Sequence, residues 1–299
     1  MAYFPTLMVA LAALFWGLSG GLGALLMADG WHASVIAFYR GAIGLLFVLI
    51  WLGLSRHTRG FTSRRLWLWS IIAGLGIAGN FTFYFLSIAE GSIAVAATLM
   101  YCAPIFVYAV SFLLGLEAFT AFKVAAIALV MLGIALLTGV YDPEPGGVTL
   151  LGMVTGVLAG LSYAVFIFGF KFAAAHGSPQ MILAVALTTL VLLLPWLGQG
   201  KQMLAALHTP DWPLFLALGV LGAGLSFFLY IVGLKNTAPA AASVVAMVEP
   251  VTASLFGVLV MGERLQSLQL AGMVLILVTV TALSTLSGTR RPARSQVTN

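Results

Sequence analysis

One acidic residue lies deep inside an apolar segment, where a carboxylate can do chemistry that a surface carboxylate cannot. Glu249 precedes Pro250 near the middle of the apolar run 238–261. An ionised carboxylate in hydrocarbon costs about 3 kcal/mol or more unless it is protonated, paired or facing water. Glu249 therefore either binds a cationic group or carries a proton, or it is a protonated carboxyl that hydrogen-bonds the backbone of a neighbouring helix and serves packing alone.

Arg40 is a basic residue in a comparable position, within the apolar run 33–54. Its guanidinium could bind the carboxylate of a solute. Alternatively, it could reach outward to a backbone carbonyl or to an acid such as Glu90. We favour the structural interpretation of Arg40.

Two prolines, Pro104 and Pro250, also stand inside apolar runs. Each removes a backbone donor and leaves a carbonyl four residues earlier without its helical partner, at Met100 and Ala246. The pair predicts two bent helices, with the prolines as hinges or as part of a binding site.

Aromatic and small polar side chains recur near the middle of the apolar runs, beside two methionines that would make an adaptable wall. Such a set suits a cavity for a neutral or aromatic solute, although each member could instead join helices. The expected lining consists of Trp16, Asn80, Tyr84, Met100, Tyr101, Tyr163, Ser226, Tyr230, Met247 and Glu249, with Ser19 and Ser162 in the same class.

The amino-acid composition indicates the class of protein in which these residues lie. Of 299 residues, 62% are apolar and 7% are charged, which is too little polar surface for a water-soluble domain. The chain is therefore expected to be an integral membrane protein without a nucleic-acid partner. Its single cysteine, Cys102, permits no intrachain disulfide, and no motif for a metal or a cofactor is present.

Ten runs are long enough to cross a hydrocarbon layer of about 30 Å. Because a lipid-exposed strand would leave backbone polar groups unpaired, they are expected to be helices of an all-α bundle. The runs are 5–27, 33–54, 66–88, 92–115, 120–140, 147–171, 179–197, 212–234, 238–261 and 267–287.

The basic residues predict the orientation of these spans. With the N-terminus inside, the inner segments hold ten Lys and Arg residues and the outer segments two. This bias predicts cytoplasmic N- and C-termini. The basic tail 288–299 is expected to be disordered in the cytoplasm.

An internal repeat relates the two halves of the sequence at an offset of 146 residues. The identical pairs include Gly76/Gly222, Tyr84/Tyr230, Pro104/Pro250 and Glu117/Glu263. Residues 1–140 and 147–287 are thus expected to form two five-helix repeats, and an odd number of spans in each inverts the second against the first. Glu249 corresponds to Ala103, so the repeat alone does not require a carboxylate there.

The ten spans, the paired prolines and the endings Leu116-Glu117 and Gly262-Glu263 resemble the drug/metabolite transporter superfamily and its EamA-type exporters. Among these, the chain most resembles the YddG-type exporters of aromatic and other neutral amino acids. The resemblance implies a basket-like bundle around a central cavity, in a bacterial inner membrane, with spans five and ten at its periphery. It also implies an amine-binding role for Glu249.

The leading hypothesis is an alternating-access secondary transporter that exports small neutral metabolites, including aromatic amino acids, threonine and methionine. A passive channel and an exporter of other metabolites or drugs are the alternatives. A membrane enzyme would need a second deep acid, base or nucleophile beside Glu249, so we do not expect an enzyme. The sequence leaves the oligomeric state open and is compatible with a monomer. Glu117 and Glu263 are expected to be solvated residues at the membrane interface.

Overall fold

The computed structural model describes residues 4–54, 60–90, 93–142, 149–197 and 200–288, and in these ranges it contains helices and no strand. Nine helical stretches there are long and apolar enough to cross a membrane. They are Phe4–Ala28, Ala33–Leu54, Arg64–Ala89, Val95–Leu113, Ala121–Thr138, Leu150–Ala173, Pro179–Trp196, Trp212–Lys235 and Pro239–Val260. The all-helical membrane fold is thus confirmed for the described residues.

The tenth predicted span, 267–287, coincides with α14 (Ser267–Gly288), in which the stretch Ser267–Leu283 is apolar. The arrangement is consistent with ten spans, and the tenth stays a prediction. The predicted tail lies outside the described residues except for Gly288, the last residue of α14.

Several helices begin at residues whose side chains satisfy free backbone donors. Ser63 caps α3 (Arg64–Ala89), Thr120 caps α6 (Ala121–Thr138) and Thr149 caps α7 (Leu150–Ala173), in each case by accepting from the amide three residues later. Unpaired amides at these positions would be costly next to lipid, so the caps fix where each span begins.

Two spans are interrupted before their prolines. One consists of α4 (Ile93–Met100) and α5 (Ala103–Leu113), and the other of α12 (Pro239–Val245) and α13 (Val248–Val260). The breaks fall at corresponding places in the two halves, where a proline cannot continue the ladder of hydrogen bonds. These interruptions lie where the prolines predict bends. Whether they act as hinges stays a prediction.

A third span is irregular without a proline. It runs through α10 (Trp212–Gly219), a π-helical turn (Val220–Leu225) and α11 (Ser226–Lys235). A π-helical turn disturbs the regular helical ladder and occurs frequently at functional sites.

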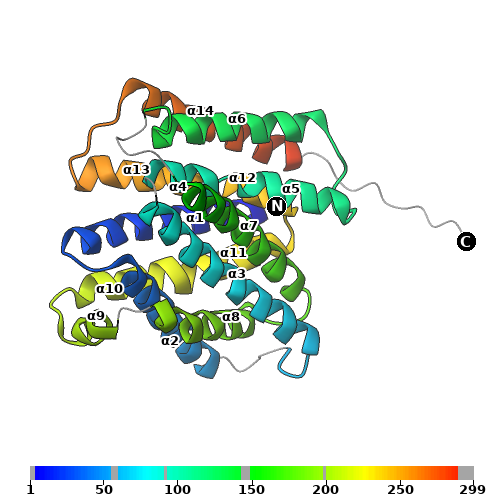
Figure 1. Cartoon of the computed structure of the whole chain (residues 1–299). Helices are drawn as coiled ribbons and strands as arrows, with labels where there is room; N and C mark the ends of the chain where they lie inside the picture. The colour runs from blue at the N-terminus through cyan, green and yellow to red at the C-terminus, as the bar shows by residue number, and fades with distance from the viewer. Residues whose placement is uncertain (1–3, 55–59, 91–92, 143–148, 198–199, 289–299) are drawn as a thin grey trace, which may run out of the picture.

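The bundle is held together by close helix contacts (Figure 1). In it, α1 (Phe4–Ala28) packs against α11 and α13, α3 packs against α7, and α6 lies beside α14 at one edge of the molecule. The opposite edge holds α2 (Ala33–Leu54) and α8 (Pro179–Leu193). The remaining short elements in the described chain are Leu194–Leu197, α9 (Gly200–Ala205) and Ala206–His208.

Glycines permit the closest of these contacts. A Cβ atom on Gly17 of α1 would lie 2.5 Å from the backbone oxygen of Glu249, and one on Gly160 of α7 would lie 2.8 Å from that of Leu99. A side chain at either position would push the helices apart, as expected for glycines at helix interfaces in membranes.

Candidate functional site

A cavity of about 280 Å³ lies inside the bundle between the two halves. The wall is formed by α1, α2, α3, the end of α4 with the break that follows it, α7, α10 and the first turns of α13. The lining residues include Trp16, Arg40, Asn80, Phe81, Tyr84, Phe85, Met100, Tyr101, Tyr163, Glu249 and Ala253.

Glu249 is placed at the cavity by the interruption that precedes α13. It is the second residue of that helix, and its half-buried side chain belongs to the cavity wall. The hydroxyl of Tyr163 donates to Glu249 Oε2 at 3.4 Å, and the Tyr101 side chain lies against the same carboxylate. In the described part of the chain, the side chains that contact this carboxylate are thus those of two tyrosines at the cavity.

Arg40 lines the same cavity from α2. Its Nε and Nη2 atoms donate to the carbonyl oxygen of Gly222 at 3.0 and 2.8 Å, and its guanidinium lies 5.4 Å from the centre of the Phe81 ring. The π-helical turn that contains Gly222 offers this carbonyl to Arg40. Glu90, the alternative partner, instead accepts from Thr149 Oγ1 at 2.9 Å. The Arg40 side chain therefore has the structural partner that we favoured and also lies at the cavity wall.

The remaining wall is aromatic, with one amide. Tyr84, Tyr101 and Tyr163 join Phe81 and Phe85, and the Asn80 amide nitrogen donates to the carbonyl of Ala159 at 3.0 Å. Such a wall can hold an apolar or aromatic group between rings, while the Arg40 guanidinium and the Glu249 carboxyl can bind polar groups.

Four of the expected residues are not part of the wall, and one of them is the half-buried Ser162 of α7. Ser226, Tyr230 and Met247 are fully buried, and neither the Ser226 hydroxyl nor the Tyr230 hydroxyl has a hydrogen-bond partner among the residues that the structure describes. Buried polar groups without partners are rare and call for an explanation.

The repeat relates the three fully buried residues to members of the wall. An offset of 146 pairs Asn80 with Ser226, Tyr84 with Tyr230 and Tyr101 with Met247. In each pair the residue from the first half lines the cavity, and its equivalent in the second half is packed away from it. The two halves therefore use corresponding positions differently in this structure.

The cavity extends toward one end of the bundle and is closed toward the other. It reaches Met27, which is 48% exposed near the end of α1. On the opposite side of Trp16 lie four buried rings, those of Phe166, Phe170, Phe227 and Tyr230. The Trp16 ring centre is 5.1 Å from that of Phe227 and 4.9 Å from that of Tyr230. We call these five residues the aromatic floor.

Sequence reasoning missed two aromatic members of the wall, Phe81 and Phe85. They directly follow Asn80 and Tyr84 along α3, so all four lie within one broad helical stripe. The stripe was available from the sequence, but phenylalanines are so frequent in this chain that their positions alone gave no signal. Within the described residues, no group of three His, Cys, Asp or Glu side chains could hold a metal ion.

The chain was compared with known families and proteins. Residues 4–139 and 150–285 both match the EamA-like transporter family, and the two ranges begin and end 146 residues apart. An uncharacterized transporter from Archaeoglobus fulgidus is 30% identical over 65% of this chain and 68% of its own. The uncharacterized transporter YwfM of Bacillus subtilis is 26% identical over 93% of both chains.

The fold also resembles a solved structure described only as the crystal structure of a protein. The two share 20% identity and a TM-score of 0.72, over 96% of this chain and 99% of the other. At that identity the likeness supports the fold alone.

Proposed function

The chain belongs to the EamA-like transporter family, and from that membership we propose a secondary transporter that carries small neutral metabolites, amino acids among them, across the plasma membrane. The observation that carries the proposal is the cavity itself, in which an acid, a base and aromatic rings face one small volume. A channel would not need such a set of groups at one place.

The substrate class follows from the charges. An amino acid at neutral pH has an ammonium group, which Glu249 and the tyrosine rings would attract, and a carboxylate, which Arg40 would attract. Its side chain would lie against Phe81 and Phe85. Because the volume is about 280 Å³, at the small end for ligand pockets, a single amino acid fits better than a larger solute.

Alternating access is the mechanism that the asymmetry between the halves supports. We infer ten spans in two inverted five-helix repeats, with Pro104 and Pro250 as hinges. Ser226, Tyr230 and Met247 would then line the cavity in a second state in which the aromatic floor separates. The hydroxyls of Ser226 and Tyr230, which have no partner among the described residues, favour this, because opening would expose both to water. With cytoplasmic termini, as the basic residues predict, the present state faces outward.

Two narrower proposals remain. The resemblance to YddG-type exporters supports the export of phenylalanine, tryptophan, threonine and methionine from a bacterial cytoplasm, and other metabolites or drugs are the alternative cargo. We also propose that the protein functions as a monomer. The buried aromatic floor argues against an open passive pore.

Counterflow in proteoliposomes tests the function directly. Vesicles loaded with unlabelled phenylalanine, tryptophan, threonine or methionine are diluted into the labelled form, with and without a pH gradient. Accelerated and saturable uptake is expected for a carrier. Uptake that is neither saturable nor accelerated would identify a channel, and no uptake of any of the four would remove amino acids as the substrate class. Protein-free vesicles are the control.

A further inference from the structure

Two glutamates follow the second halves of the two broken spans, α5 and α13, through the same turn. The amide of Glu117 donates to the carbonyl of Ser111 at 3.3 Å, and the amide of Glu263 donates to that of Gly257 at 3.1 Å. In both bonds the donor follows the acceptor by six residues. The two acceptors, Ser111 and Gly257, are 146 residues apart, and so are the two donors, Glu117 and Glu263. The backbone therefore places Glu117 and Glu263 equivalently in their halves.

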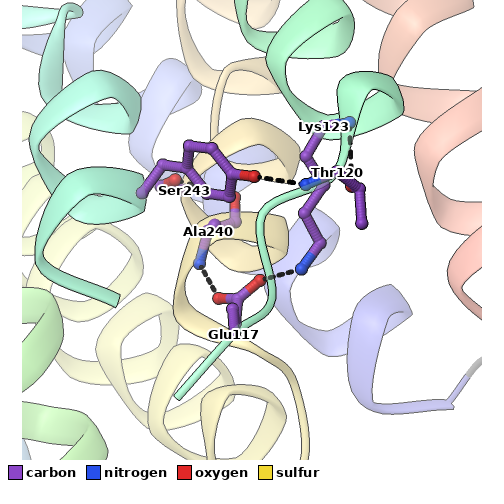
Figure 2. A network of polar contacts seen from close by, with 6 residues as sticks. Glu117, Thr120, Lys123, Ala240 and Ser243 are labelled. Carbon is purple, nitrogen blue, oxygen red and sulfur yellow. Dashed lines mark hydrogen bonds and ion pairs between the residues drawn. The ribbon is translucent and has the colours of Figure 1, made fainter. Parts of the chain in front are cut away.

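The side chain of Glu117 joins the two halves (Figure 2). Its Oε1 accepts from the backbone amide of Ala240 at 2.9 Å, and its Oε2 pairs with Lys123 Nζ at 2.5 Å. Glu117 is only 8% exposed, so the expectation of a solvated residue is wrong for it. Because hydrogen bonds to a carboxylate are about twice as strong as neutral ones, this contact holds α12 firmly against the connection between α5 and α6.

Glu263 makes no such contact. Its exposed carboxylate folds back against Gly257, where the lack of a Cβ atom leaves room for it, and within the described residues it has no hydrogen bond or ion pair. The residue equivalent to Ala240 is Ala94, which is likewise the second residue of its helix, α4. The equivalent of Lys123 is Gln269, which instead bonds the amide of Gln266 and the carbonyl of Leu137.

The two glutamates lie at opposite ends of the cavity pathway. Near Glu117, α12 follows the end of α11, whose Gly233 packs on Pro5 and Val9 at the beginning of α1, the closed end. Helix α13 runs from Glu249 past Ala253 toward Glu263, along the part of α1 that leads to the open end. The contact is thus made where the pathway is closed and absent where it is open.

We propose that Glu117 and Glu263 are two latches that close alternate ends of the pathway. In the structure described, Glu117 holds α12 and Glu263 is released. In the second state, Glu263 accepts from the amide of Ala94 while Glu117 releases Ala240. The proposal rests on the alternating access proposed above. It predicts that the equilibrium between the two states depends on the contacts of Glu117 and Glu263.

Reporter cysteines related by the repeat can measure that balance. In a Cys102→Ser background, Ala253→Cys places a thiol on the open cavity, and Val107→Cys places one at the equivalent position, which is fully buried. The thiols react with a membrane-impermeant maleimide added to either face of oriented vesicles. The parent protein is expected to label at Ala253→Cys from the face opposite the termini and only slowly at Val107→Cys from the face that carries them.

Removal of a latch shifts the labelling in a defined direction. Glu117→Ala is expected to accelerate labelling of Val107→Cys about tenfold and to slow labelling of Ala253→Cys. Glu117→Gln keeps an acceptor for Ala240 and is expected to shift labelling less. Glu263→Ala destabilises only the second state, so it slows labelling of Val107→Cys about tenfold. The double variant Glu117→Ala/Glu263→Ala returns toward the parent ratio, because each state has then lost one latch.

The double variant separates a latch from general damage. Labelling of the double variant equal to that of Glu117→Ala, or unchanged labelling in Glu263→Ala, would overturn the proposal. Since Glu263 is exposed, its variant provides this decision even if Glu117→Ala does not fold. Asp142→Ala, which removes an exposed acid outside the helices, is the matched control and should change nothing. Labelling needs no substrate, so it decides the latches even if counterflow detects no transported amino acid.

Discussion

Glu249 is the group that an ammonium ion would meet at the centre of the cavity. Glu249→Gln keeps its size and its contact with Tyr163 but removes the charge. Because a hydrogen bond to a charged partner contributes about 1.5–3 kcal/mol, the half-saturating concentration of phenylalanine in counterflow should rise about 10- to 100-fold. Inhibition by 3-phenylpropionate, which lacks the amine, should be unaffected. Equal weakening of both ligands would show that Glu249 serves packing instead.

The second role of Glu249, as a proton carrier, is tested by the same variant. If the carboxyl takes up a proton during the cycle, Glu249→Gln should lose the dependence of transport on the pH gradient, because glutamine does not titrate. Counterflow at several internal and external pH values measures this. A pH dependence that survives the substitution would exclude Glu249 as the proton carrier.

Arg40 is expected to stabilise the bundle, and its substitution tests this. Arg40→Ala leaves the Gly222 carbonyl unpaired inside the bundle, and an unsatisfied buried acceptor costs about 1–3 kcal/mol. The melting temperature of Arg40→Ala in detergent should therefore fall. The melting temperature of Arg40→Lys should fall less, because lysine retains the charge and one donor. An unchanged melting temperature together with lost transport would assign Arg40 to substrate binding alone.

The chemistry of the site could be predicted from single residues, but its boundaries could not. Glu249 stood out because a carboxylate inside an apolar run needs a reason. Tyr84 and Tyr230 are indistinguishable by type and by position in their repeats, and yet one lines the cavity and the other lies in the aromatic floor. That difference depends on which end of the bundle is closed, which no local pattern encodes.

At the scale of helices, two glycines of α1 allow a matched test of packing. A Cβ atom on Gly17 would lie 2.5 Å from the Thr252 Cβ atom, whereas one on Gly20 would lie 3.8 Å from that of Ala253. Gly17→Ala should therefore lower stability by about 1–3 kcal/mol, and Gly20→Ala should be tolerated. Thermal unfolding of both variants in detergent measures the difference. Equal melting temperatures would mean that α1 and α13 separate easily.

The interruptions of the helices could be predicted from the sequence only where a proline causes them. Pro104 and Pro250 indicated both interrupted spans because a missing donor has a fixed effect on a helix. The π-helical turn at Val220–Leu225 gave no comparable signal, since its apolar and glycine residues also suit a regular membrane helix. It is stabilised by Arg40, a partner 182 residues away, which a local pattern cannot reveal.

For the whole molecule, the repeat and its asymmetry belong to one explanation. Both halves match the same family, and corresponding positions still differ in burial and in bonding. A symmetric sequence in an asymmetric arrangement implies a second arrangement of similar free energy, in which the halves exchange roles. The members of the pairs Asn80/Ser226 and Glu117/Glu263 differ in burial or in bonding, so their surroundings would change in the exchange.

This explanation requires the two halves to be inverted across the membrane, which surface labelling can test. Asp29 follows α1, and its equivalent Ala175 follows α7; both are exposed in turns. In a Cys102→Ser background, Asp29→Cys should react with an impermeant maleimide added outside intact cells. Ala175→Cys should react only after the membrane is opened, because five spans per half place equivalent turns on opposite sides. Labelling of both from outside would make the repeats parallel, and parallel repeats could not exchange the open and closed ends of the pathway.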